Sequence, residues 1–329
     1  MAAAYTGHGA YVSFWEEGTW GTDARGSGTQ RTYDLESFAG GGLQYNREPI
    51  PALASASRTT RGHFLASVVA DPEVTLFCCY KSMGLFYKHA LGGTPSTTGA
   101  SAPYTHTVLT AMSLPVGLTM EVNLGNSGES YVYVGCKIDS MTIDLVAADV
   151  FRIKIKFMAK TATRDSSPTS ASFVAGRDMQ ANHAGFTSLT WGSLTAWTDI
   201  VRKVTLNINN SLARRQNLGS AYTAEPTFGG FAEFTADVEL DYQTGGAVLT
   251  AIAADDGSAA DAVLLLTDPT DNDNTIEVTL HGAFVTTSKL GEIAGPSIMV
   301  DTLTLRGLSL GSDAGIAIVW TNDASAALT

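Results

Sequence analysis

The sequence predicts a mainly β protein made of two β-rich domains in tandem. Glycine accounts for 33 of 329 residues, about one in ten against a usual 7%, and this abundance favours many turns over long helices. Apolar and basic side chains alternate along residues 151–157, as in a strand with one face in the core. The strand patterns of the first half also recur in the same order in the second half. Such a recurrence indicates an internal duplication.

The first 31 residues are rich in glycine, tyrosine and tryptophan, and we interpret residues 1–31 as an extended arm with little regular structure. The first domain then covers residues 32–162. Its strands are predicted from runs of alternating, β-branched and aromatic residues, at 32–38, 43–46, 64–68, 104–109, 118–124, 131–134, 137–145 and 151–158. Residues 47–62 are polar, contain two prolines and are predicted to form a long hairpin tip.

One short α-helix is predicted in the first domain. Asp71 would cap its first amides, Pro72 is tolerated in the first turn, and Glu73 suits the positive end of the helix dipole. Gly84 is expected to end this helix. The sequence therefore predicts a helix that starts near residue 71 and stops before residue 84.

The second half is predicted to be a copy of the first. Residues 163–182 are rich in serine and threonine at their start and are expected to form a linker, which leaves 183–329 as the second domain. Four pairs of segments carry the duplication, namely 64–68 with 234–238, 120–124 with 276–280, 46–47 with 214–215, and 151–157 with 299–305. Because loops vary more than strands, the unequal spacings are compatible with two diverged copies.

The charges are distributed unequally. The chain carries 20 Lys and Arg against 32 Asp and Glu, a net charge of −12, and all of this excess lies in the second half. Between Arg215 and Lys289 there are twelve acidic residues and no basic one. Tight binding in a nucleic-acid groove needs clustered cations, so the second half is not expected to bind nucleic acid in this way. The basic face of the strand at 151–158 is expected to be solvated or to meet an acidic partner.

The remaining composition points to self-association inside a cell. Charged residues make up 16% of the chain, against about 25% in a typical soluble domain, so much of the surface could be covered by other copies. Cys78, Cys79 and Cys136 are an odd set with two adjacent members, which indicates a reducing compartment and buried thiols. No apolar run approaches 18 residues, and we expect neither a membrane span nor a secretory signal.

No pattern of catalytic or metal-binding residues is complete. Gly307, Ser309 and Gly311 fit a hydrolase nucleophile motif, but no histidine follows His281, so the required order of the triad is missing. The six histidines lack the spacing of a zinc site. Residues 268–274 offer oxygen ligands without the glycine and distal glutamate of a calcium loop; a solvated acidic turn is favoured, with a cation site as the alternative. We expect no enzyme, no cofactor and no metal.

The chain resembles the tail tube, or major tail, proteins of long-tailed non-contractile bacteriophages. The likeness starts at the Glu-Gly-Thr-Trp-Gly-Thr stretch of residues 17–22. It continues in the order of the family through 62–91, 104–107, 118–122, 133–141, 204–212 and 230–240. The resemblance spans most of the chain.

The resemblance implies two tandem β-sandwich domains, each with one short flanking α-helix and long hairpin loops. Rings of such sandwiches stack into a hollow tube in the virion tail, through which DNA passes into the host. The usual ring has six sandwiches, so three duplicated chains would complete it with pseudo-sixfold symmetry. The implied partners are the chain itself and the tape-measure, tail terminator and distal tail proteins. DNA would be only a repelled cargo, and assembly would take place in the bacterial cytoplasm without a membrane.

Two groups of residues are expected to serve this function. The hairpins at 47–62 and 216–230 are predicted to join stacked rings, with contacts from Arg47, Arg58, Arg61, Arg214 and Arg215. The acidic residues are expected to face the pore, where they would repel DNA; the candidates are Asp255, Asp256, Asp261, Asp268, Asp271 and Asp273. The alternatives are another phage structural protein, either a tail terminator or a capsid decoration protein, and a β-rich adhesin or carbohydrate-binding module.

Overall fold

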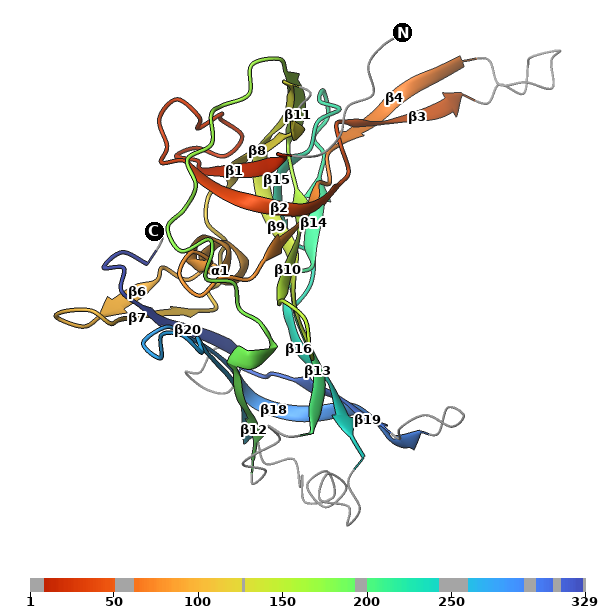
Figure 1. The fold of residues 1–329 in the computed structure, drawn as a ribbon. Coiled ribbons are helices and arrows are strands. Elements are labelled where there is room, and N and C mark those ends of the chain that lie inside the picture. The colour runs from red at the N-terminus through yellow and green to blue at the C-terminus, as the bar shows by residue number, and fades with distance from the viewer. Residues whose placement is uncertain are drawn as a thin grey trace, which may run out of the picture.

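Figure 1 shows a molecule built mostly of antiparallel strands. The computed structural model describes residues 9–50, 62–125, 128–192, 200–242, 260–292, 300–309 and 315–327. This described part contains twenty strands and one α-helix, α1 (Gly84–Leu91). The prediction of a mainly β fold is confirmed.

Eight strands form one continuous antiparallel layer, which we call the long layer. In spatial order its members are β2 (Arg31–Ala39), β5 (Glu73–Phe77), β10 (Arg152–Met158), β9 (Ser130–Val146), β13 (Val201–Asn209), β16 (Glu233–Asp241), β19 (Val300–Arg306) and β18 (Thr275–Glu292). The first four come from the first half of the chain and the last four from the second. The pairing of β9 with β13 joins the two halves.

Two further groups of strands, the short layers, face the long layer. The first consists of β1 (Tyr11–Glu16), β8 (Leu118–Asn123) and β11 (Thr161–Asp165) with the start of β9. The second consists of β12 (Phe186–Trp191), β17 (Ala260–Thr267), β20 (Ile316–Asn322), β7 (Tyr104–Leu109) and β6 (Ser96–Thr98) with the start of β18. Because β9 and β18 continue into the long layer, each ties two layers together.

The order of pairing confirms an internal duplication. In the first repeat β1 pairs with β8, β8 with β9, β9 with β10, β10 with β5 and β5 with β2. In the second repeat β12, β17, β18, β19, β16 and β13 pair in the same sequence. A hairpin lies between β2 and β5, formed by β3 (Gln44–Ile50) and β4 (Gly62–Val69), and its counterpart lies between β13 and β16, formed by β14 (Leu212–Arg215) and β15 (Ala224–Phe228).

Equivalent backbone hydrogen bonds fix the alignment of the repeats. The amide of Ala159 donates to the carbonyl of Ala70 at 2.9 Å, and the amide of Gly307 donates to that of Phe234 at 3.0 Å. The bends of β9 and β18 both contain a glycine with positive φ, Gly135 at 74° and Gly282 at 54°. The amide of Gly135 donates to the carboxylate of Glu17, and the amide of Gly282 donates to that of Asp261. Positions along β10 therefore correspond to positions 148 residues later along β19.

Two of the four sequence pairs fall on corresponding strands and two do not. In the first of these pairs the described residues 152–157 and 300–305 are counterparts in β10 and β19, while residue 299 lies outside the described part. Residues 46–47 and 214–215 lie on corresponding hairpin strands. Segment 64–68 belongs to β4, whereas 234–238 belongs to β16, the counterpart of β5. Segment 120–124 lies mostly in β8, whose counterpart is β17 and not the β18 segment 276–280. All half-buried strands share an alternation with a period of two. This pattern therefore could not show which strand of one repeat corresponds to which strand of the other.

The core lies between the long layer, the short layers and α1. One row of buried side chains crosses the long layer from repeat to repeat, and its central members are Leu76, Ile153, Ile143, Leu206, Ala236 and Leu305. Helix α1 adds Leu85, Phe86 and Tyr87, all buried, and the rings of Phe86 and Phe14 meet at 5.1 Å. The two repeats thus share one continuous apolar core.

The predicted helix near residues 71–84 was wrong. Residues Glu73–Phe77 form β5, because Val74 and Leu76 alternate into the core between β2 and β10. The helix begins at Gly84, where a Cβ would lie 2.1 Å from the carbonyl oxygen of Ala327, and it ends at Gly92, with φ of 85°. Among the described residues of the second repeat, the only helical segment is a 3-10 turn, His183–Gly185. The interval between β16 and β17 that corresponds to α1 includes residues 243–259, outside the described part.

The interpretation of the N-terminal stretch as an irregular arm was also wrong. Residues Tyr11–Glu16 form β1 between β2 and β8, with Val12 and Phe14 fully buried. The proposed linker lies along the first repeat, where the amide of Val174 donates to Thr32 and that of Ala181 donates to Cys78. The domain boundaries remain predictions, and β7 of the first half pairs with β20 of the second.

Candidate assembly site: a polar sheet face, two open edges and two hairpins

The long layer turns a polar face away from the core. In β10, Arg152, Lys154 and Lys156 alternate with buried apolar residues and point to this face. Each basic group meets an acid: Arg152 lies 2.7 Å from both Glu36 and Asp149, Lys154 lies 3.0 Å from Glu73, and Lys156 lies 3.5 Å from Asp139. The expected acidic partner of this strand is therefore supplied by the same chain.

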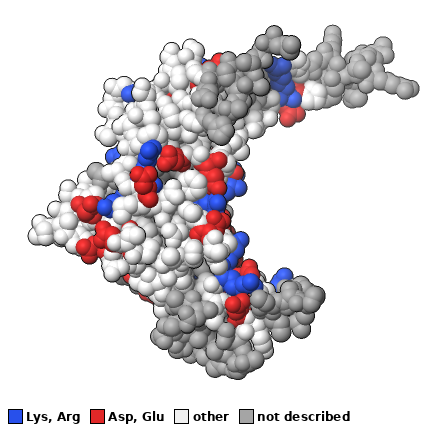
Figure 2. All heavy atoms as spheres, in the orientation of Figure 1, with Lys and Arg blue, Asp and Glu red and all other residues white. Residues whose placement is uncertain are grey.

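Hydrogen bonds carry the polar face across the joint between the repeats. The hydroxyl of Thr205 on β13 donates to Asp144 on β9 at 2.8 Å, and Thr142 on β9 donates to Asn207 on β13 at 3.0 Å. Asp237 on β16 accepts from Asn207 at 3.1 Å. These contacts make the polar face continuous over both repeats. Figure 2 shows basic and acidic atoms interspersed along the hollowed side of the molecule.

The long layer ends in two edges that have no partner strand within the described chain. Residues 35–39 of β2 pair only with β5, and residues 284–292 of β18 pair only with β19. The β18 edge exposes Thr286, Thr287, Ser288 and Lys289. Unpaired amides and carbonyls on an edge strand form a template for another strand. The two edges lie at opposite ends of the layer.

The β3–β4 hairpin projects from the body of the molecule (Figure 1). It exposes large side chains, Tyr45, Phe64 and Leu65, at 56%, 53% and 41% of their full accessible surface. Arg47 lies in β3 opposite Leu65, rather than in the predicted tip, and its side chain is exposed. Arg58 and Arg61 fall outside the described residues. Exposed aromatic and aliphatic groups on a projecting hairpin suit a contact with another molecule.

The β14–β15 hairpin packs on the first repeat of its own chain. Arg214 forms an ion pair with Asp71, and burial lowers the pKa of the guanidinium. Lys137 lies 2.6 Å from Glu225, and the amide of Val68 donates to the carbonyl of Ala221 at 2.8 Å. Arg214 is thus engaged within the chain, whereas Arg215 is exposed.

The described acidic candidates belong to the second short layer and its turn. Asp261 on β17 accepts from the amide of Gly282 at 3.0 Å. Asp268 is buried; burial opposes its charge, but hydrogen bonds led by the Thr270 hydroxyl keep its pKa below the ordinary value. Asp271 accepts from Asn274, and Asp273 is exposed in the same turn. Asp255 and Asp256 lie outside the described residues, and the described part contains no cluster of three metal-binding side chains.

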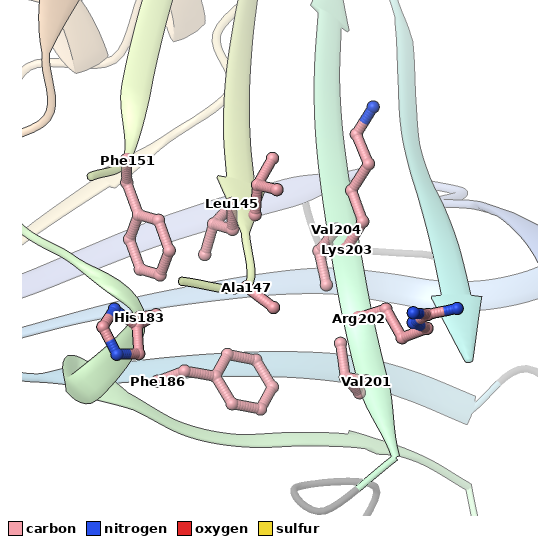
Figure 3. A pocket seen from close by; sticks show the side chains of 10 residues that line it. Leu145, Ala147, Phe151, His183, Phe186, Val201, Arg202, Lys203 and Val204 are labelled. Atoms are coloured by element: carbon pink, nitrogen blue, oxygen red, sulfur yellow. The ribbon is translucent and has the colours of Figure 1, made fainter. Parts of the chain in front are cut away.

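A pocket of about 190 Å³ lies at the joint between the repeats (Figure 3). The rings of Phe151 and Phe186 and the side chain of Leu145 border it, while Arg202 and Lys203 point away. His183 is the one histidine among the residues that line it. No nucleophile with an adjacent base is found among the ten lining residues.

Sequence reasoning missed both free edges and the acids that neutralise β10. The alternation at 151–157 signalled a polar face, but its partners come from β2, β5 and β9, which are distant in sequence. The duplication could have predicted the free edges. When two like repeats pair side by side, the combined sheet keeps one unpaired edge strand at each end. Among the described residues no helix is long and apolar enough to cross a membrane.

Comparison with known proteins agrees with this architecture. No curated protein matches the chain. A family model described as "Phage tail tube protein" matches residues 7–307, which include both repeats, the polar face and both hairpins. The chain therefore belongs to the phage tail tube protein family, and it is a structural component of a phage tail.

Proposed function

We propose that three copies of this chain close a ring with pseudo-sixfold symmetry, and that stacked rings form the hollow tube through which DNA leaves the virion. The observation that carries this proposal is the β9–β13 joint, which links two like repeats within one chain. If the same pairing also forms between two copies of the chain, each new copy adds two repeats to the row, head to tail. A head-to-tail contact closes into a ring when its rotation permits, whereas stacking stays open and gives a filament.

The dimensions of the long layer suit such a ring. Three copies of the eight-stranded layer give twenty-four strands. With strands spaced about 4.8 Å apart, they would enclose a barrel roughly 37 Å across at the backbone, or wider if the strands tilt. That bore, lined with side chains, leaves room for a DNA duplex. Closure would also remove both free edges of every chain.

The polar face of the long layer is our candidate for the pore lining, because its other face is in the core. Its basic groups are paired with acids in neighbouring strands, so they would not present the clustered cations that hold DNA. In this arrangement Asp261, Asp268, Asp271 and Asp273 lie in the layer away from the pore. Asp144, Asp237 and Glu239 would line the pore instead, together with the acids that pair with the basic groups of β10.

Stacking of rings is attributed to the hairpins. The β3–β4 hairpin projects furthest, and it would carry Arg47, Arg58 and Arg61 to an acidic surface of the next ring. In the second repeat, the exposed Arg215 of the β14–β15 hairpin is the candidate for the same contact. Tape-measure, tail terminator and distal tail proteins would contact the ends or the bore of the tube, in a virion tail assembled in the host cytoplasm.

Negative-stain electron microscopy of the purified chain tests the proposal against the alternatives. We expect hollow tubes of uniform width, because stacking is an open contact. Discrete rings at all concentrations would favour a tail terminator, and monomers that coat capsids would favour a decoration protein. Monomers that bind host polysaccharide would favour an adhesin or carbohydrate-binding module.

A further inference from the structure

We propose that the free edge of β18 pairs with the free edge of β2 on the next copy of this chain, in the register that the β9–β13 joint already shows. This inference rests on the proposed ring. Residues 287–289 of one copy would lie antiparallel to residues 41–43 of the next. Gly41 would then stand opposite Lys289, and Leu43 opposite Thr287.

The first half of this register follows from the equivalence of β9 and β18. Ile155 of β10 corresponds to Leu303 of β19, since both lie four residues before the matched hydrogen bonds at Ala159 and Gly307. Ile155 faces Met141, and Leu303 faces Ser288. The glycines at the bends, Gly135 and Gly282, give the same offset of 147 residues. Thr142 therefore corresponds to Lys289.

The second half follows from the equivalence of β13 and β2. Val74 on β5 faces Phe38, and its counterpart Val238 on β16 faces Val204. A bulge precedes each of these positions, between Leu35 and Ser37 in β2 and between Val201 and Lys203 in β13. Phe38 and Val204 are thus counterparts. Counting on from them, Asn207 corresponds to Gly41.

The internal joint then specifies the joint between copies. Thr142 stands opposite Asn207, with their side chains 3.0 Å apart on the polar face. Their counterparts are Lys289 and Gly41. Both counterparts are exposed in the single chain, as residues at an unpaired edge are. The polar face would continue from one copy into the next without a gap.

The run Gly40–Gly42 explains why β2 stops at residue 39 of the long layer, whereas its counterpart β13 continues to residue 209. In the single chain Gly40 and Gly42 have φ of 82° and 84°, and the hydroxyl of Tyr133 bonds to both of them. The counterparts of these glycines, Leu206 and Ile208, are extended within β13. Glycine adopts left-handed and extended backbone with similar ease. The segment can therefore extend β2 when the edge of another copy arrives, and it offers no long edge before then.

Disulfide trapping in the full-length chain tests the register. The variant with Gly41→Cys and Lys289→Cys, oxidised mildly after assembly, is expected to give covalent dimers and closed trimers on a non-reducing gel. A Cβ at Gly41 would lie 3.5 Å from Tyr131, an ordinary contact, so the substitution fits the fold. The native cysteines are buried, and burial raises the pKa of Cys78 and Cys79 to about 12, which suppresses competing disulfides.

Matched variants make the result specific. Each single substitution should give no covalent dimer, and Gly41→Cys with Thr287→Cys, two residues out of register on the same face, should cross-link far less. Thr142→Cys with Asn207→Cys should form its disulfide within one chain and run as a monomer. Tubes that form without covalent dimers would contradict the pairing of β18 with β2 and leave the proposed function standing.

If the wild-type chain forms no tubes or rings, the proposed function itself fails. Ladders that continue beyond the trimer would support the joint but contradict the three-chain ring.

Discussion

Neighbouring acidic residues at the end of β1 have opposite surroundings and separate roles. Glu17, the first residue of the stretch that resembles the family, accepts hydrogen bonds from the amides of Gly21 and Gly135 at 2.6 and 2.7 Å. Burial is the larger influence and raises its pKa. The indole of Trp20 donates to the carbonyl of Gly135 at 3.1 Å. This stretch therefore holds the bend of β9, where the first short layer passes into the long layer.

Glu16 ties β1 to α1 by charge. Its carboxylate lies 3.2 Å from the ring of His89 and 2.6 Å from the ammonium of Lys88. The hydrogen bond with His89 is the largest influence, and together with Lys88 it outweighs burial and lowers the pKa of Glu16 to about 2. A carboxyl with a lowered pKa in the folded state stabilises the fold above its unfolded value of 4.5, and this stabilisation is lost as the pH falls toward 2.

We expect Glu16→Gln to lower the free energy of unfolding at pH 7 by about 1–3 kcal/mol, because it removes a charge-assisted contact. The difference from wild type should shrink between pH 4.5 and pH 2, where the wild-type carboxylate takes up its proton. Urea unfolding at a series of pH values measures both effects. Glu48→Gln, at an exposed position in β3, is the control and should change little. A pH-independent difference at Glu16 would contradict the assignment.

Individual strands were largely predictable, whereas the identity of neighbours was not. Alternation located β10 and β19 because their apolar residues meet the core on one face. The same local reasoning failed at residues 71–84, where Asp71, Pro72 and Glu73 resemble a helix start. There the apolar residues of β5 are placed between β2 and β10, and this pairing outweighs local preference. The hairpin between β3 and β4 was expected, but Arg47 lies in a strand and not in the tip.

Deletion of residues 54–61, which include Arg58 and Arg61, is expected to leave a folded chain that forms rings but not tubes. The strands β3 and β4 would keep their pairing, because the deletion falls between them. Circular dichroism checks the fold, and negative-stain microscopy checks assembly. A variant in which the same residues are replaced by an equal length of glycine and serine separates loop length from side-chain contacts. Tubes of normal length from the deletion variant would refute the role of this hairpin in stacking.

At the scale of the whole molecule, the duplication determines the architecture. The sequence suggested two copies, but it did not reveal that β9 and β13 merge them into one eight-stranded layer. Nor did it reveal that β7 of the first half completes the second short layer through β20. Both pairings join residues far apart in the chain, and local patterns carry no information about them. The acids at 261–273, expected at the pore, lie on the second short layer and its turn, and whether they face the pore stays a prediction.

A cryo-EM map of the assembled tube tests the central claim most directly. The account predicts rings of three chains, each chain supplying two similar lobes, around a continuous wall of twenty-four strands with β18 of one chain beside β2 of the next. The mass of each ring would then be three times 34.5 kDa. A map with six chains in each ring, or with the polar face of the long layer on the outer wall, would contradict it.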